Sequence, residues 1–154
     1  MKNDDDLRKR IGEVEDRLAL RELVDTFSTL SDRKEVREQT QLFTANATVE
    51  TYRGGVLVTK LTGRKEMEDA FGGFLKNFEK VYHINGQQTV TLNGDRASGI
   101  SYCMVTLIGT DNGKKMKTSI GVFYNDEYVR ENGRWLIAKR VSNFHWEDKR
   151  ELGR

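Results

Sequence analysis

The chain has 154 residues, of which 36% are hydrophobic and 32% charged, and these values fit a single globular domain over residues 1–154. Its 26 basic and 24 acidic residues leave a net charge of +2, which is too balanced for the electrostatic footprint of a nucleic-acid-binding protein. No apolar run approaches the roughly 18 residues of a membrane helix, and the N-terminus lacks the apolar core of a signal peptide. We therefore expect a cytoplasmic protein with no nucleic-acid or membrane partner.

The first half of the chain has helical periodicity. Apolar residues recur at steps of three and four over about residues 5–30, which predicts one long amphipathic helix. These residues are Leu7, Ile11, Val14, Leu18, Leu23, Val24, Phe27 and Leu30. A shorter helix is predicted over 36–43, and a hairpin that turns at 53–55. The segment 63–78, "GRKEMEDAFGGFLKNF", returns to helical spacing.

The second half of the chain is predicted to form an antiparallel meander. Asn-Gly pairs fit the type I′ turns of tight hairpins, and three of them follow one another, at 93–94, 112–113 and 132–133. They separate β-rich runs over about 81–92, 96–110, 114–130 and 134–142. In the last run Trp135 and Ile137 share one face and are predicted to lie in the core. The domain core is therefore expected over about 10–142, and the charged segment 143–154 is expected to fray or to dock on a partner subunit.

A fourth Asn-Gly pair, Asn85-Gly86, is interpreted differently. A turn there would leave only "VYHI" before it, so we interpret Gly86 as a β-bulge inside a strand. A bulge bends the strand and re-aims its side chains. Simple alternation would place His83, Asn85 and Gln87 on one polar face, unless the bulge changes the alternation.

These elements together predict an α+β fold. Long strands with glycine kinks curl strongly, and three helices would cover the concave side of the curled sheet. Such an arrangement leaves a pocket between the helices and the sheet, suited to a small hydrophobic molecule.

Asp32 and His83 are the candidate catalytic residues, and each has a second interpretation. An imidazole accepts and donates protons near neutral pH, and a carboxylate beside it fixes its tautomer. Alternatively, Asp32 and Glu35 form a capping box for the second helix, and His83 is an exposed or structurally bonded histidine. The other histidine, His145, lies in the charged C-terminal segment and is expected on the surface.

Two further sets of residues complete the sequence-based picture. Among the five tyrosines, Tyr52 and Tyr102 are predicted to line the pocket, although most tyrosines in strands serve packing. The single cysteine, Cys103, excludes an internal disulfide and is predicted to be a small buried hydrophobic residue. The chain has no phosphate loop, dinucleotide fingerprint or metal-ligand spacing, so we expect no cofactor and no metal.

The chain resembles the SnoaL-like branch of the NTF2-like superfamily, which includes polyketide cyclases and scytalone dehydratase. The resemblance covers about residues 10–142 and depends on the order of four stretches. They are "IGEVEDRLALRELVDTFSTLSDRKEVREQTQLFTANATVE", "LTGRKEMEDAFGGFL", "YHINGQQTVTLNGDRASGISY" and "YVRENGRWLIAKR". It implies a conical sheet wrapped around helices with an enclosed pocket, often in a dimer, and we expect a homodimer or higher homo-oligomer formed through the sheet face.

The resemblance also implies site residues. Asp32 and His83 match the pocket aspartate and histidine of the dehydratase-like members, and Tyr52 is similar to a pocket tyrosine. Gln87 stands where the family usually has an asparagine, so it is included among the substrate-binding candidates. The departures are Ser31, where the dehydratase has a tyrosine, and the absence of a second histidine from strand 96–110.

Three functions are compatible with these residues. The first is a small cofactor-independent enzyme in which the Asp32–His83 pair promotes dehydration, cyclisation or isomerisation of an apolar carbonyl compound. The alternative is a module that binds a small ligand without chemistry, which the departures at Ser31 and in strand 96–110 favour. The third is a structural partner domain that associates through its sheet face.

Overall fold

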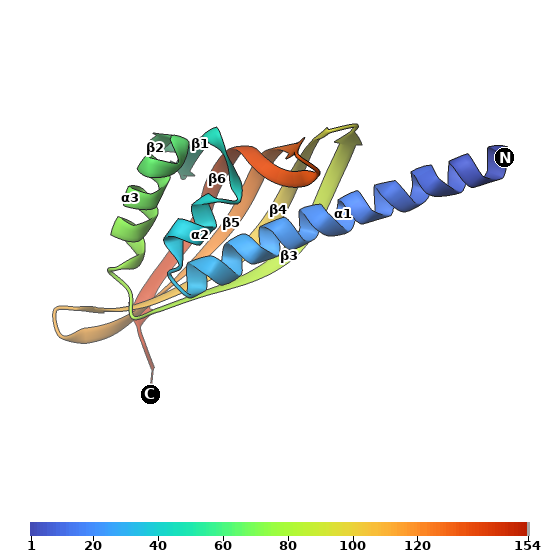
Figure 1. Cartoon of the computed structure of the whole chain (residues 1–154). Coiled ribbons are helices and arrows are strands. Elements are labelled where there is room, and N and C mark those ends of the chain that lie inside the picture. Colours follow the sequence, from blue (N-terminus) through green and yellow to red (C-terminus); the bar gives the residue numbers. More distant parts are fainter. Residues whose placement is uncertain (154) are drawn as a thin grey trace.

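A long helix and one strongly curved sheet define the architecture (Figure 1). The computed structural model describes residues 1–153. The helices are α1 (Lys2–Asp32), α2 (Val36–Thr40) and α3 (Gly63–Leu75). The strands are β1 (Phe43–Arg53), β2 (Val56–Thr62), β3 (Lys80–Asn93), β4 (Arg96–Asp111), β5 (Lys114–Glu131) and β6 (Arg134–Glu151). The sheet order is β2-β1-β6-β5-β4-β3, and all neighbours are antiparallel except β1 and β6. The predicted α+β class is confirmed.

The hairpin turns follow the Asn-Gly chemistry of the sequence in two of three cases. Asn112 and Asn132 adopt positive φ angles of 49° and 52°, and each is followed by a glycine with positive φ, as a type I′ turn requires. The turn between β3 and β4 is shifted by one residue to Gly94 and Asp95, and of these two only Gly94 has a positive φ. All three predicted hairpins therefore form, two of them with the turn at the predicted Asn-Gly pair and the third with the turn one residue later.

The predicted bulge at Gly86 is confirmed, and it changes which residues of β3 face inward. Asn85 pairs with Cys103, and Gln88 pairs with Ser101, so two residues of β3 oppose one residue of β4. Beyond the bulge the inward positions are therefore even-numbered, beginning with Gln88. Gln87 is exposed, which corrects the prediction that it shares a face with His83.

The segment 143–154 was predicted to fray or to dock on a partner subunit. The prediction of fraying is wrong for the described residues, and docking on a partner stays a prediction. Strand β6 continues to Glu151 and pairs with β5 as far as Met116. The cause is the length of β5, whose backbone offers hydrogen-bond partners along the whole segment. Exposed ion pairs, such as Lys149 with Asp111 at 2.9 Å, accompany the pairing.

The helices cover the concave face of the sheet and bury the core there. Leu20, Val24 and Phe27 of α1 pack with Phe43 and Ile137 in the main cluster, in which Trp135 is also buried, as predicted. A second cluster lies under α3, around Val105, Leu107 and Ile120. None of the helices described in residues 1–153 has the length and apolar character needed to cross a bilayer.

Candidate active site

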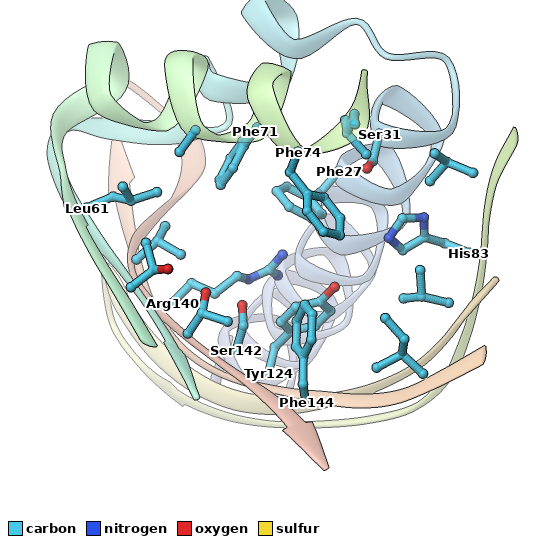
Figure 2. A pocket seen from close by; sticks show the side chains of 18 of the residues that line it. Phe27, Ser31, Leu61, Phe71, Phe74, His83, Tyr124, Arg140, Ser142 and Phe144 are labelled. Carbon is cyan, nitrogen blue, oxygen red and sulfur yellow. The ribbon is translucent and has the colours of Figure 1, made fainter. Parts of the chain in front are cut away.

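A cavity of about 200 Å³ lies between the concave sheet and the helices (Figure 2). Its wall is mainly apolar, and four phenylalanine rings contribute to it: Phe27, Phe71, Phe74 and Phe144. A few polar side chains interrupt the apolar lining, among them Ser31, Gln39, His83, Tyr124, Arg140 and Ser142. An apolar cavity with a small number of polar groups is the usual form of a small-molecule site.

Asp32 and His83 meet at one side of this cavity. Asp32 Oδ1 lies 2.6 Å from His83 Nδ1, and Asp32 Oδ2 accepts a hydrogen bond of 3.1 Å from the backbone N–H of His83. The carboxylate therefore holds both the ring and the backbone of the histidine. The His83 side chain is only 7% exposed, and its ring points into the cavity (Figure 2). Because Nδ1 faces Asp32, Nε2 is the ring nitrogen left for a ligand.

The alternative interpretation of Asp32 as a helix cap is wrong. Asp32 is the last residue of α1, and α2 has Glu35 at its N-cap, without a side-chain capping bond within the described chain. The backbone explains this arrangement, since Lys34 adopts a φ of 58° and the N–H of Glu35 bonds to the carbonyl of Leu30 at 2.9 Å. This C-terminal motif leaves the Asp32 carboxylate free to turn towards β3.

Other bonds between α1 and β3 fix the position of His83. Asn85, two residues further along the strand, accepts a hydrogen bond from Ser28 Oγ at 3.1 Å and donates one to Asp25 Oδ1 at 2.8 Å. Past the bulge, Gln88 Nε2 donates to the carbonyl of Leu20. The edge strand is thus tied to the helix at several points, so the histidine is held on a rigid frame.

A buried arginine, Arg140 of β6, also lines the cavity. Its side chain is 1% exposed and forms two hydrogen bonds of 2.8 Å with Asp126, which is itself buried. The guanidinium lies over the rings of Tyr124, at 3.9 Å, and Phe27, at 4.3 Å. Burial by itself would lower the pKa of Arg140, but the charge and hydrogen bonds of Asp126 outweigh this effect and raise the pKa.

One nitrogen of this guanidinium has no hydrogen-bond partner among the described residues. Within residues 1–153, Arg140 Nη1 is buried and has no hydrogen-bond partner. Figure 2 shows the side chain reaching into the cavity from the sheet, beside Tyr124 and Ser142. A buried donor that lacks a partner is unfavourable by about 1–3 kcal/mol, and an oxygen atom of a bound ligand would satisfy it.

Three predicted pocket residues lie elsewhere. Tyr52 is absent from the lining because its neighbours Thr51 and Arg53 face the cavity, and alternation turns Tyr52 to the opposite face of β1. Tyr102 is 46% exposed and stacks on Phe123 at 5.7 Å, on the outer face of the sheet. The bulge at Gly86 turns Gln87 outward as well. The phenol in the cavity is Tyr124, whose pKa burial raises.

Arg140 was not predicted to line the cavity, because a bulge in β6 changes which residues of that strand face inward. Tyr128 pairs with Ile137, and Glu127 pairs with Lys139, so Ala138 is an extra residue in β6. Strict alternation from Trp135 and Ile137 would have placed Lys139 inside and Arg140 outside. The sequence of β5 did contain a relevant pattern. Asp126 occupies an inward position in an otherwise apolar alternating series, and a carboxylate buried there needs a cation as its partner.

The remaining predicted residues lie where they were expected. His145 is exposed and packs edge-on against Phe123 at 5.8 Å. Cys103 is buried at 5% exposure, and burial raises its pKa to about 12. Among the described residues, no three His, Cys, Asp or Glu side chains gather in the way that metal ligands do.

The thiol of Cys103 should be inert in the folded protein. Its pKa of about 12, against an ordinary 9.0, makes the thiolate fraction near pH 8 about 1,000-fold smaller than in the unfolded chain. We expect a disulfide reagent to label Cys103 rapidly in denaturant and very slowly without it. Because the folded chain keeps a proton that the unfolded chain loses, the thiol's contribution to stability is full below pH 9.0 and decreases as the pH rises towards 12. Equal labelling rates in both states would contradict this prediction.

Comparisons with known proteins agree with this architecture. A family model described as a SnoaL-like domain matches residues 12–141. An uncharacterised protein of Mycobacterium tuberculosis is 27% identical over 134 residues, which cover 85% of this chain and 86% of that protein. The chain also resembles the crystal structure of a candidate scytalone dehydratase from Novosphingobium aromaticivorans, with 17% identity, coverage of 92% and 91% and a TM-score of 0.78.

A second similar crystal structure is that of a hexachlorocyclohexane dehydrochlorinase. It is 15% identical, the match covers 94% of this chain and 93% of that one, and the TM-score is 0.77. At such identities the likeness shows the fold alone, which is the α+β fold of the NTF2-like superfamily. Family and fold together fit a small enzyme-like or ligand-binding domain.

Proposed function

Since the chain belongs to the SnoaL-like domain family, we propose that it is a cofactor-independent enzyme acting on a small, apolar carbonyl compound. The reaction is a dehydration, cyclisation or isomerisation that begins with loss of a proton beside the carbonyl. The observation that carries the proposal is the Asp32–His83 pair, in which the His83 ring faces a mainly apolar cavity. The names of the two similar crystal structures, a candidate dehydratase and a dehydrochlorinase, both describe eliminations.

Three polar side chains have roles in this mechanism. Nε2 of His83 accepts the proton from the carbon beside the carbonyl, and the electron pair of that C–H bond moves to the carbonyl oxygen as an enolate. Asp32 holds the imidazole in the tautomer that leaves Nε2 free, and it stabilises the imidazolium that forms. Arg140 Nη1 donates a hydrogen bond to the enolate oxygen. In a dehydration, the enolate electrons return to re-form the carbonyl and a C=C bond forms as the C–O bond to the leaving hydroxyl breaks. The imidazolium gives its proton to that hydroxyl, which departs as water.

A module that binds a ligand without chemistry is the second candidate function. Two observations favour it. Ser31 precedes Asp32 and lines the cavity as a small hydroxyl, and strand β4 carries no histidine to act as a second proton-transfer group. In this case the aromatic wall and Arg140 hold the ligand, and the Asp32–His83 pair serves as a fixed hydrogen-bonding group.

Deuterium exchange separates the two functions without knowledge of the product. The purified protein is incubated in D₂O with a panel of cyclic ketones and β-hydroxy ketones small enough for the cavity, and exchange of the C–H beside the carbonyl is followed by NMR. If the protein is an enzyme, the C–H proton of at least one bound ligand should be replaced by deuterium faster than in buffer. Ligands that bind tightly but never exchange faster than in buffer would overturn the proposed chemistry and support the binding module.

A further inference from the structure

The long helix α1 carries two apolar faces that point in opposite directions. Its C-terminal half buries Leu20, Val24 and Phe27 against the sheet. The N-terminal half carries a second row, the N-terminal stripe, formed by Leu7, Ile11, Val14 and Leu18. Leu18 and Leu20 are two residues apart, so they lie about 200° apart around the helix. The N-terminal stripe therefore lies on the side of α1 opposite the core face. At its C-terminal end, Val14 and Leu18 border an open surface groove beside Val90 of β3.

The stripe has no cover within the described part of the chain. Its four residues are 52%, 49%, 57% and 64% exposed, in chain order. Figure 1 shows that the first turns of α1 extend past the end of the sheet into open space. Isolated helices shorter than about 12–15 residues are marginal in water, so a projecting amphipathic segment needs a packing partner to stay ordered.

The spacing within the stripe is that of a coiled coil. Steps of four, three and four residues place Leu7 and Val14 at d positions and Ile11 and Leu18 at a positions. We propose that this segment pairs with the same segment of a second copy of the chain, in a parallel two-helix contact. Since the stripe and the core face are on opposite sides of α1, the two bodies would lie on the outer sides of the helix pair.

The charges beside the stripe favour a second copy in the parallel orientation. Arg10 and Arg17 occupy g positions, while Glu15 and Glu22 occupy e positions. In a parallel pair each g residue faces the e residue five positions later on the other helix. Arg10 then meets Glu15 of the second copy, and Arg17 lies near Glu22, so all four pairs bring opposite charges together. Arg17 Nη1 also donates a hydrogen bond of 2.9 Å to the carbonyl of Val90 in its own chain, which leaves its other nitrogens for Glu22. An antiparallel pair would instead bring Arg10 next to Arg17.

Variants of the exposed stripe test the contact without disturbing the core. Light scattering should give a mass twice the chain mass of 17.7 kDa. The double variant Ile11→Glu with Val14→Glu should weaken association by about 100-fold or more, because it places charges in the buried contact. Lys9→Glu changes a charge on the other side of the same segment and should leave the dimer intact. Circular dichroism and thermal melting check that both variants remain folded.

The orientation is tested by a single new cysteine. In the parallel pair Leu7 lies beside Leu7 of the second copy, so Leu7→Cys should form an intermolecular disulfide on mild oxidation. The native Cys103 is buried and should not interfere. A dimer without this disulfide would overturn the parallel arrangement. A monomeric wild-type protein would overturn the proposal. A dimer that persists in the double glutamate variant would overturn it as well, because the two copies would then associate through another surface. The outer sheet face, with the exposed Ile84 and Tyr102, is one such surface.

Discussion

Replacement of His83 by glutamine should lower the rate of proton exchange in the proposed reaction by about 100- to 10,000-fold, the usual contribution of a positioned general base. Glutamine keeps a polar group in the cavity but cannot take up a proton. Asp32→Asn should have an effect of similar direction, because an amide cannot stabilise the imidazolium as a carboxylate does. The measurement is the NMR exchange rate in D₂O with a ligand that the wild-type protein turns over.

The chain provides a matched control for this experiment. His145→Gln changes the other histidine, which is exposed and lies away from the cavity lining, so it should exchange at the wild-type rate. Ligand affinity, measured by calorimetry, should change little in His83→Gln, since apolar wall contacts provide most of the binding. If His83→Gln bound the ligand and exchanged at the wild-type rate, His83 would not be the base. If it bound no ligand at all, Arg140→Lys and Asp32→Asn would have to separate binding from chemistry.

The elements of the fold were predictable because their signals are local. The apolar steps of α1 and the Asn-Gly turns depend only on residues close in sequence, and each predicted element appears, with one turn displaced by a single residue. The Asp32–His83 contact was not predictable from local patterns, since capping and pairing use the same carboxylate. The backbone at Lys34 determines which interaction forms. Its left-handed conformation ends α1 so that Glu35, and not Asp32, is the N-cap of α2, and the Asp32 carboxylate can therefore bond to His83.

The lining of the cavity was harder to predict, and bulges are the reason. One extra residue exchanges the two faces of a strand beyond it, so an error of a single residue moves every later side chain to the wrong side. Gln87 was misplaced by the bulge at Gly86, and Arg140 was hidden by the extra residue Ala138. The wrong predictions for Tyr52 and Tyr102 have a different cause, because a tyrosine in a strand is compatible with either face of the sheet.

Arg140→Met should destabilise the fold by about 3–5 kcal/mol, the range measured when one partner of a buried ion pair is removed. Methionine fills part of the space but leaves the Asp126 carboxylate buried and without its cation. Urea denaturation followed by tryptophan fluorescence measures the change in the free energy of unfolding. Arg53→Met is the matched control, because Arg53 also lines the cavity, lies over Phe144 at 4.5 Å and pairs with Glu147 at 2.9 Å. Its side chain is 38% exposed, so this variant should lose only about 0–1 kcal/mol.

A double-mutant cycle decides whether the stability comes from the ion pair or from the volume of the arginine. Asp126→Asn alone should also be strongly destabilising, since it leaves the Arg140 charge uncompensated beside Phe27 and Tyr124. In the double variant Arg140→Met with Asp126→Asn no charge remains buried, so its loss should be smaller than the sum of the single losses by about 1–3 kcal/mol. Additive losses would mean that the two side chains act independently. Arg140 would then have to be retained for packing on the two rings, and its role as a charged donor towards the cavity would lose its main support.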